Sequence, residues 1–125
     1  MSVGWPEYAK LHHFGTLVAD AFGDWPFQVG SSVGNDSKRS WHDVDVVLIL
    51  ADEEHAAMRI GHPDRAGENP RWVALCWAFS ELGRSITGLP IDFKIQQRTH
   101  ANAQHGGRTR NALGTLPYRG PGEGD

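Results

Sequence analysis

The chain has 125 residues, 22% of them charged, and a formal net charge of −3 at pH 7. A single domain of this length buries roughly two-thirds of the surface of its unfolded chain, so it needs no disulfide or structural metal. The slightly negative charge gives no general argument for nucleic-acid binding. The one cysteine, Cys76, excludes a disulfide framework and lies in the apolar run WVALCWAF, where a buried small side chain is expected.

The apolar segments are short. No run approaches the roughly 20 apolar residues that cross a membrane. The first ten residues, MSVGWPEYAK, have neither the basic start nor the apolar centre of a signal peptide. We therefore expect a reduced protein of the cytoplasm with no membrane partner.

The first half of the chain predicts one helix followed by two strands. Apolar residues recur at helical spacing from Trp5 to Phe22, with Pro6 suited to the first turn and Gly23 to the end. Three segments follow: a short strand, a polar loop and a longer strand, at residues 27–29, 30–40 and 43–50. The longer strand is apolar on both faces after its second aspartate, as expected for a central strand.

The second half predicts a short helix that Asp52 caps, a surface loop, a long helix and a third strand, at residues 52–60, 61–68, 70–87 and 91–96. Asn69 can cap the long helix and Pro70 can begin it. An apolar stripe of seven residues follows along that helix: Trp72, Val73, Leu75, Cys76, Phe79, Leu82 and Ile86.

The third strand alternates between two kinds of side chain. Ile91, Phe93 and Ile95 point one way, and Asp92, Lys94 and Gln96 point the other way. One face of this strand is therefore expected in the core and the other at a polar surface. After Arg98 we expect only a weak helical turn near residues 111–113 and a disordered end from about residue 116.

These elements predict an α/β (α+β) fold, with a short mixed sheet of three to four strands packed against two main helices. The site is expected on the open face of that sheet. Residues 1–115 are expected to form one domain, and residues 116–125 a flexible tail.

The acidic residues at the strand ends carry the chemistry. Asp43 and Asp45 are two residues apart in a strand and so share a face, and Asp92 joins them if its strand is a neighbour. Two carboxylates about 4 Å apart repel by about 4 kcal/mol at an effective dielectric near 20, so one is protonated, paired with a cation or bound to a divalent metal. An all-oxygen donor set suits Mg²⁺ or Mn²⁺ better than zinc. The simpler alternative is that Asp43 and Asp45 cap a turn.

Three motifs in this order resemble the nucleotidyltransferase superfamily typified by DNA polymerase beta. They are Gly30-Ser31, then Asp43-Val44-Asp45 after eleven intervening residues, and Ile91-Asp92-Phe93 on a later strand. The chain is most similar to the minimal single-domain members and to small nucleotidyltransferase-like proteins of actinobacteria and their phages, in which the helix PRWVALCWAFSELGRSITGLPIDFKIQQ has close counterparts. The resemblance spans about residues 8–97 and implies the polymerase-beta-like fold.

The resemblance also implies a reaction. A nucleotidyl group would pass from a nucleoside triphosphate, such as ATP, to a hydroxyl of a small molecule, an RNA or a protein, with release of pyrophosphate. Gly30 and Ser31 would hold the β- and γ-phosphates, Asp43 and Asp45 would bind Mg²⁺ (or Mn²⁺), and Asp92 would complete a second metal site and help activate the acceptor hydroxyl. Two metals about 3.5 to 4 Å apart stabilise the entering and leaving oxygens in such reactions.

Several basic residues have two readings. Lys38 and Arg39 either contact the triphosphate or belong to a solvated loop, and Lys94 either neutralises phosphate charge or pairs with the carboxylates. No Asp or Glu occurs from residue 93 to residue 122, so this basic segment suits a phosphate-bearing partner or a solvated tail.

Two other functions remain open from the sequence. One is a catalytically silent nucleotide-binding or regulatory module that retains the fold. The other is a partner-dependent component of toxin-antitoxin type that acts on RNA or protein. A homodimer or a small partner protein is compatible with each.

Overall fold

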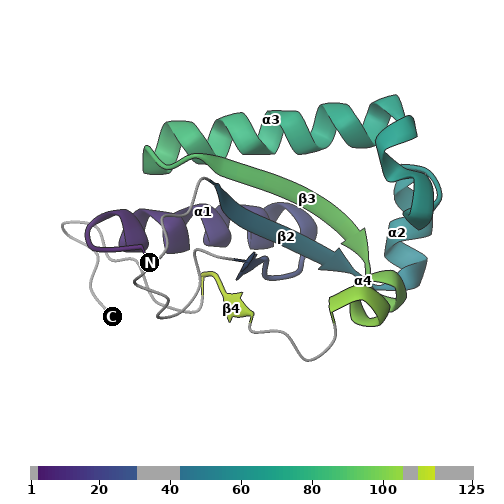
Figure 1. The fold of residues 1–125 in the computed structure, drawn as a ribbon, viewed down its shortest axis with the longest axis horizontal. Helices are drawn as coiled ribbons and strands as arrows, with labels where there is room; N and C mark the ends of the chain where they lie inside the picture. The colour runs from purple at the N-terminus through teal and green to yellow at the C-terminus, as the bar shows by residue number, and fades with distance from the viewer. Residues whose placement is uncertain (1–2, 31–42, 106–109, 115–125) are drawn as a thin grey trace.

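The computed structural model describes residues 3–30, 43–105 and 110–114. It contains one four-stranded sheet in the order β3-β2-β1-β4 (Figure 1). The strands are β1 (Phe27–Val29), β2 (Val44–Leu50), β3 (Ile91–Gln97) and β4 (Asn111–Ala112). Strands β2 and β3 are parallel, whereas β1 is antiparallel to both β2 and β4. The sheet is therefore mixed, and the predicted α+β class is confirmed.

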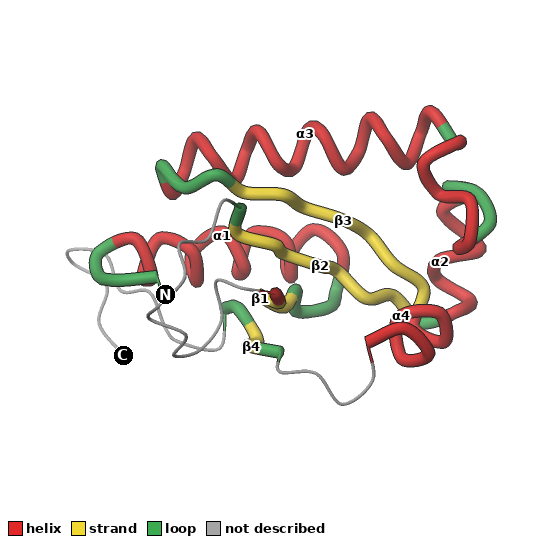
Figure 2. Tube along the Cα trace, in the orientation of Figure 1, coloured by secondary structure: helices red, strands yellow, loops and turns green. Residues whose placement is uncertain are grey.

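Five helical segments lie among the residues described from 43 to 105 and in the first described range. They are α1 (Glu7–Phe22), α2 (Asp52–Met58), the 3-10 helix η2 (Pro63–Glu68), α3 (Pro70–Thr87) and α4 (Arg98–His105). Figure 2 shows α1 and α3 running along the sheet, with α2 and η2 beyond the far ends of β2 and β3. None of the helices in the described ranges is both long and apolar enough to cross a membrane.

The core lies between the sheet and its two long helices. Helix α1 ends at Gly23, whose φ of 83° is the left-handed conformation that glycine adopts without strain. Leu11, Phe14 and Val18 of α1 are fully buried against the sheet. Alternate residues of the two parallel strands complete this core: Val44, Val46, Leu48 and Leu50 from β2, and Ile91, Phe93 and Ile95 from β3. The predicted alternation of the third strand is therefore confirmed.

Small residues bring α3 close to the sheet. Asn69 caps the helix as predicted, because its side chain accepts hydrogen bonds from the N–H groups of Arg71 and Trp72. The buried line, however, is Cys76, Ser80, Gly83 and Thr87. The predicted apolar stripe is wrong at Val73 and Leu82, which are 39% and 40% exposed. Helix rotation follows the small residues here, since a Cβ on Gly83 would stand 2.9 Å from Ile91.

Polar side chains of α3 cover the outer edge of β3, which is an edge strand. Trp72 Nε1 donates to the Ile95 carbonyl at 2.8 Å, and Ser80 Oγ accepts from the Phe93 N–H at 2.8 Å. One helical turn further on, Arg84 Nε donates to the Ile91 carbonyl at 3.1 Å. An edge strand left bare presents unpaired backbone groups to other chains, so this ladder protects it.

Two predictions for the middle of the chain are corrected. Ala51, rather than Asp52, stands at the N-cap of α2. The Asp52 carboxylate instead accepts from the N–H and the hydroxyl of Thr99, in the first turn of α4. The segment predicted as a surface loop contains the 3-10 helix η2, whose Pro63 suits a helix start.

The C-terminal prediction is also wrong in part. Helix α4 replaces the expected irregular chain, and β4 replaces the weak helical turn near residues 111–113. Strand β4 pairs with β1, and the next residue, Leu113, is fully buried beneath α1. Long-range burial therefore determines this segment. The expected flexible tail, residues 116–125, lies outside the described residues.

The described residues cover the second face of the sheet only in part. Ala101 of α4 packs against Val47 and Ile49 of β2, together with Phe27 and Val29 of β1. The predicted burial of β2 on both faces is therefore confirmed. Helix α4 lies near the ends of β2 and β3 (Figure 1), so among the described residues no helix covers the beginnings of these strands on this face.

Candidate functional site

Two of the three predicted carboxylates lie side by side at the open end of the sheet. Asp45 of β2 pairs in register with Asp92 of β3 and, on its other side, with Val29 of β1. Parallel strands that pair directly place both side chains on one face. Asp43 lies two residues before Asp45, just ahead of β2, and is exposed. The structure therefore brings together the acidic residues that the sequence predicted from separate segments.

Gly30 packs directly against one of these carboxylates. It follows the last residue of β1 and has a φ of +79°. A Cβ at this position would stand 2.6 Å from Asp45 Oδ2, which is closer than non-bonded atoms approach. The backbone conformation thus favours glycine here, and a side chain at this position would displace the Asp45 carboxylate. The turn after β1 and the acidic pair form one site.

The site carries more negative than positive charge. Burial raises the pKa of the Asp45 carboxyl above its usual value, Asp92 raises it further, Lys94 partly opposes this, and Asp43 adds a smaller increase. Lys94 Nζ lies 3.6 Å from Asp92 Oδ2, and both side chains are partly exposed. The structure thus shows Lys94 beside a carboxylate, one of its two predicted roles. A divalent cation would relieve the remaining repulsion.

The residue types fit a hard cation. Asp43, Asp45 and Asp92 offer carboxylate oxygens only, the donors that Mg²⁺ and Mn²⁺ prefer. Burial is the main cause of the raised pKa of Asp45, and the neighbouring Asp92 adds to it. Across residues 3–30, 43–105 and 110–114, however, no three His, Cys, Asp or Glu side chains stand in a preformed ligand arrangement. The donor types thus fit the cation, whereas the side chains of the described residues are not arranged as its ligands.

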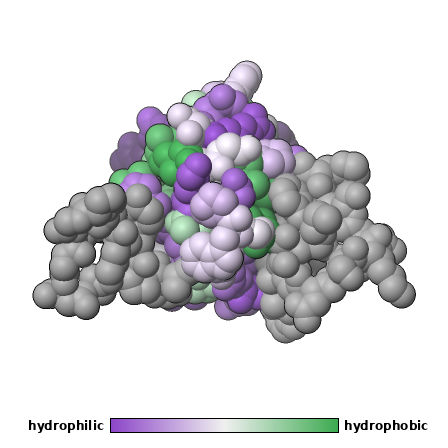
Figure 3. Space-filling model, turned by 90° about the vertical axis from the view of Figure 1, so that its left-hand side faces the viewer, coloured by the Kyte–Doolittle hydropathy of each residue, from purple (hydrophilic) through white to green (hydrophobic). Residues whose placement is uncertain are grey.

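The remaining residues predicted to contact a phosphate-bearing partner either lie outside the described residues or contact other side chains. Ser31, Lys38 and Arg39 lie outside the described residues, so their predicted contacts with a triphosphate stay predictions. Arg110 is described and donates to Asn102 Oδ1 at 3.3 Å. Seen from the end where β2 and β3 begin, the described surface mixes hydrophilic residues with smaller hydrophobic patches (Figure 3).

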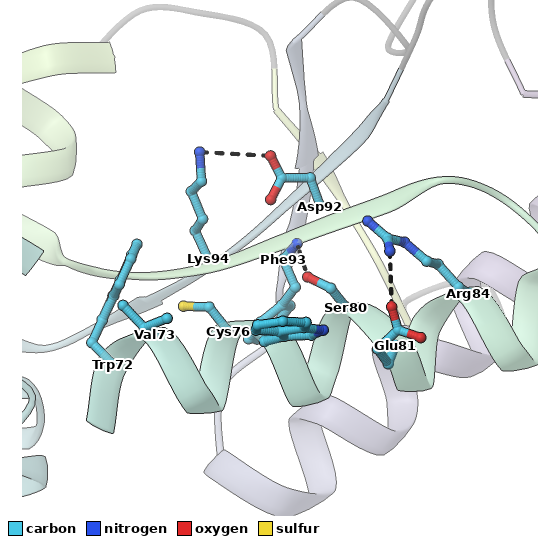
Figure 4. A pocket seen from close by; sticks show the side chains of 10 residues that line it. Trp72, Val73, Cys76, Ser80, Glu81, Arg84, Asp92, Phe93 and Lys94 are labelled. Atoms are coloured by element: carbon cyan, nitrogen blue, oxygen red, sulfur yellow. Dashed lines mark hydrogen bonds and ion pairs between the residues drawn. The ribbon is translucent and has the colours of Figure 1, made fainter. Parts of the chain in front are cut away.

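A groove of about 400 Å³ adjoins the acidic pair and was not predicted from the sequence. It runs between α3 and the edge of β3 (Figure 4), with Asp92 and Lys94 on the strand side. Its helix side is apolar at one end, where Trp72, Val73 and Trp77 line it, and polar at the other, where Ser80, Glu81 and Arg84 do. The available sequence signal was Trp77, a large apolar residue outside the predicted stripe of this helix, which the structure shows to be 68% accessible.

A cluster of one aspartate and two histidines lies in and beside η2. The Asp64 carboxylate stands 3.1 Å from His100 Nδ1 and 3.8 Å from His62 Nδ1. Asp64 and His62 are mostly exposed, and the cluster lacks the glycine turn and the neighbouring carboxylate that define the first site.

Comparisons of the chain with protein-family models, with curated proteins and with solved structures returned no match.

Proposed function

We propose that this protein transfers a nucleotidyl group from a nucleoside triphosphate to a hydroxyl acceptor, with Mg²⁺ (or Mn²⁺) as cofactor. The pairing of Asp45 with Asp92 across β2 and β3, with Gly30 against the Asp45 carboxylate, is the observation that carries the proposal. The simpler alternatives are that these aspartates cap a turn or form a surface ion pair. Neither alternative requires two carboxylates in register on neighbouring strands beside a glycine turn. The resemblance of the Gly30-Ser31 and Asp43-Val44-Asp45 motifs to nucleotidyltransferases supports the same reading.

Each part of the site has a role in this proposal. Asp43, Asp45 and Asp92 hold the cation, which, when bound, withdraws charge from the phosphate oxygens and supports departure of pyrophosphate. The turn at Gly30 receives the β- and γ-phosphates, and the absence of a side chain lets them approach the backbone. Lys94 exchanges its carboxylate partner for phosphate oxygen once the triphosphate is present. Most of the catalytic effect then comes from position and electrostatics.

The reaction balances with these groups alone. The acceptor oxygen forms a bond to the α-phosphorus, the bond from that phosphorus to the bridging oxygen breaks, and pyrophosphate leaves with the electron pair. The acceptor proton passes to the Asp92 carboxylate and then to water. A cytoplasmic location, where nucleoside triphosphates are abundant, belongs to the same proposal.

The test compares two aspartate variants. Each of the four labelled ribonucleoside triphosphates is incubated with Mg²⁺ and a mixed set of hydroxyl acceptors, and pyrophosphate release is measured. Asp45→Asn should lower release at least about a hundredfold, because the metal loses a charged ligand. Asp20→Asn, on the exposed side of α1, is the control and should match the wild type. Equal release from the wild type and Asp45→Asn would overturn the proposal.

A binding measurement separates the two alternative functions. A nucleotide that binds the folded chain raises its melting temperature even without turnover. A Mg²⁺-dependent rise that Asp45→Asn abolishes, without pyrophosphate release, would identify the silent nucleotide-binding module. Release that begins only after a partner protein is added would identify the partner-dependent component.

A further inference from the structure

The groove lies on the opposite side of the acidic pair from the glycine turn. The sheet order places β3, β2 and β1 next to one another, so Asp92, Asp45 and the turn at Gly30 follow in a line across the strands. The groove begins beyond Asp92, at the outer edge of β3 (Figure 4). Neighbouring strands are about 4.8 Å apart. The line from the turn at Gly30 across the strands to the groove is therefore long enough for a triphosphate and one acceptor group to lie along it.

This order matches what an in-line displacement requires. The entering and leaving oxygens stand on opposite sides of the α-phosphorus. If pyrophosphate leaves on the Gly30 side, the acceptor oxygen enters on the Asp92 side. We propose that the groove between α3 and β3 binds the acceptor, and that the acceptor is a small, neutral compound whose hydroxyl is carried by an aromatic ring. This inference rests on the proposed nucleotidyl transfer.

The apolar end of the groove supports an aromatic acceptor. Val73 and Trp77 are one helical turn apart on α3, and they are 39% and 68% exposed. Trp77 lines the groove and is largely accessible, so an aromatic ring can stack on its indole or meet it edge to face. A volume of about 400 Å³ lies within the range of about 300 to 1,000 Å³ that is typical of small-molecule sites.

The charges of the groove support a neutral acceptor. Arg84 Nη1 is 2.8 Å from Glu81 Oε1, and Lys94 Nζ is 3.6 Å from Asp92 Oδ2. Each of the two cations that line the groove thus stands beside a carboxylate. Arg84 also donates to the Ile91 carbonyl, which further restricts it. A nucleic-acid acceptor needs free cations for its phosphates, and the described residues that line the groove have no surplus of them.

The step itself forms one bond and breaks one. The ring hydroxyl oxygen attacks the α-phosphorus, its proton passes to Asp92, and the products are an aryl nucleotidyl ester and pyrophosphate. No oxidant or reductant is required.

The first arm of the test measures binding without nucleotide. N-acetyl-L-tyrosinamide, which is small, neutral and phenolic, serves as the probe, and its dissociation constant is measured by ligand-detected NMR. Trp77→Ala should weaken binding roughly tenfold, since a stacking partner is lost. Trp5→Ala is the matched control because Trp5 is also 68% exposed and lies outside the groove. Val73→Ala and Leu82→Ala form a second matched pair, with weaker binding expected only for Val73→Ala. Equal binding by Trp77→Ala and Trp5→Ala would overturn the groove as the binding site.

The second arm measures transfer. With Mg²⁺ and labelled triphosphate, the probe should become labelled, and Trp77→Ala should raise KM for the probe roughly tenfold while leaving the affinity for the metal–triphosphate unchanged. Loss of metal–triphosphate affinity in Trp77→Ala would mean that the groove holds the nucleobase, which overturns the inference. A short RNA labelled in preference to the probe would overturn the neutral aromatic acceptor, and a capped Gly-Gly-Tyr-Gly-Gly peptide labelled at least about tenfold better would overturn the small compound. Failure of the proposed function is distinct, because the wild-type chain would then release no pyrophosphate with any acceptor of the mixed set, whether or not it binds the metal–triphosphate.

Discussion

The two faces of the sheet are made from alternate residues of the same strands and obey opposite rules. On the helix-covered face, Val46 and Phe93 are fully buried among other apolar side chains. On the other face, the residues immediately before them, Asp45 and Asp92, stand side by side with an unfavourable charge balance. Residues that stabilise the fold and residues whose charges destabilise it are thus next to each other in the sequence and lie on opposite faces of the sheet. Residues that lower the stability of the folded chain, and whose cost no structural contact explains, are typical of functional sites.

The largest expected effect is on the core face. Phe93→Ala should lower the free energy of unfolding by about 3 to 5 kcal/mol, because a buried ring that contacts Phe14 and Phe79 is replaced by a cavity. Lys94→Ala, one residue further on the other face, should change it by no more than about 0.5 kcal/mol. Urea unfolding measures both. Similar losses for the two variants would contradict the assignment of the faces.

Gly30→Ala should have the next largest effect, because it forces a side chain into the acidic site. Gly88→Ala is the matched control, since Gly88 has a φ of +74° and nothing within 4 Å of its absent Cβ. The control should lose about 1 to 2 kcal/mol from backbone strain alone, and Gly30→Ala should lose more. The excess should shrink when Asp45 is also changed to alanine, which removes the colliding carboxylate. An excess unchanged by Asp45→Ala would mean that Gly30 does not pack on this side chain.

Ser80→Ala tests the edge of β3, where the two faces meet. The Phe93 N–H would lose its acceptor, and a buried unsatisfied N–H costs about 1 to 3 kcal/mol. Ser85→Ala, at an exposed position of the same helix, should change stability by about 0.5 kcal/mol or less. The comparison is made by thermal unfolding. A Ser80→Ala variant as stable as Ser85→Ala would show that the hydroxyl does not cover the strand.

The smallest effect concerns pH and the acidic pair. The pKa of Asp45 is raised in the folded chain, mainly by burial, so the folded state binds a proton more tightly than the unfolded state. Stability therefore falls as pH rises from the ordinary value of 3.8 through the raised pKa. Asp45→Asn should melt roughly 1 to 3 °C higher than the wild type at pH 7, and the two should converge below pH 3.8. A lower melting temperature for Asp45→Asn at pH 7 would contradict this sign.

Local patterns predicted the elements that local chemistry determines. The period-two alternation of residues 91–96, the Asn69-Pro70 helix start and the short strand at residues 27–29 all appear in the structure. The convergence of Asp45 and Asp92 followed from the same alternation once the strands were neighbours.

Long-range contacts determine what was missed. Helix α4 is polar, and its first turn is held by Asp52 from another element. Strand β4 depends on pairing with β1 and on the burial of Leu113. The groove depends on how α3 rotates over β3, which is determined by small residues such as Gly83 rather than by the largest apolar ones. The residue pattern of a single segment does not indicate which distant segments will contact it.

The most direct measurement is where Mn²⁺ binds. Mn²⁺ broadens NMR signals of nearby nuclei, so the labelled chain is titrated with Mn²⁺ in the presence of a non-hydrolysable triphosphate analogue. The amide signals of Gly30, Asp45 and Asp92 should broaden first, and Asp45→Asn should abolish this selectivity. Broadening that begins instead at His62, Asp64 and His100, or that is uniform across the chain, would contradict a metal–triphosphate site on the open face.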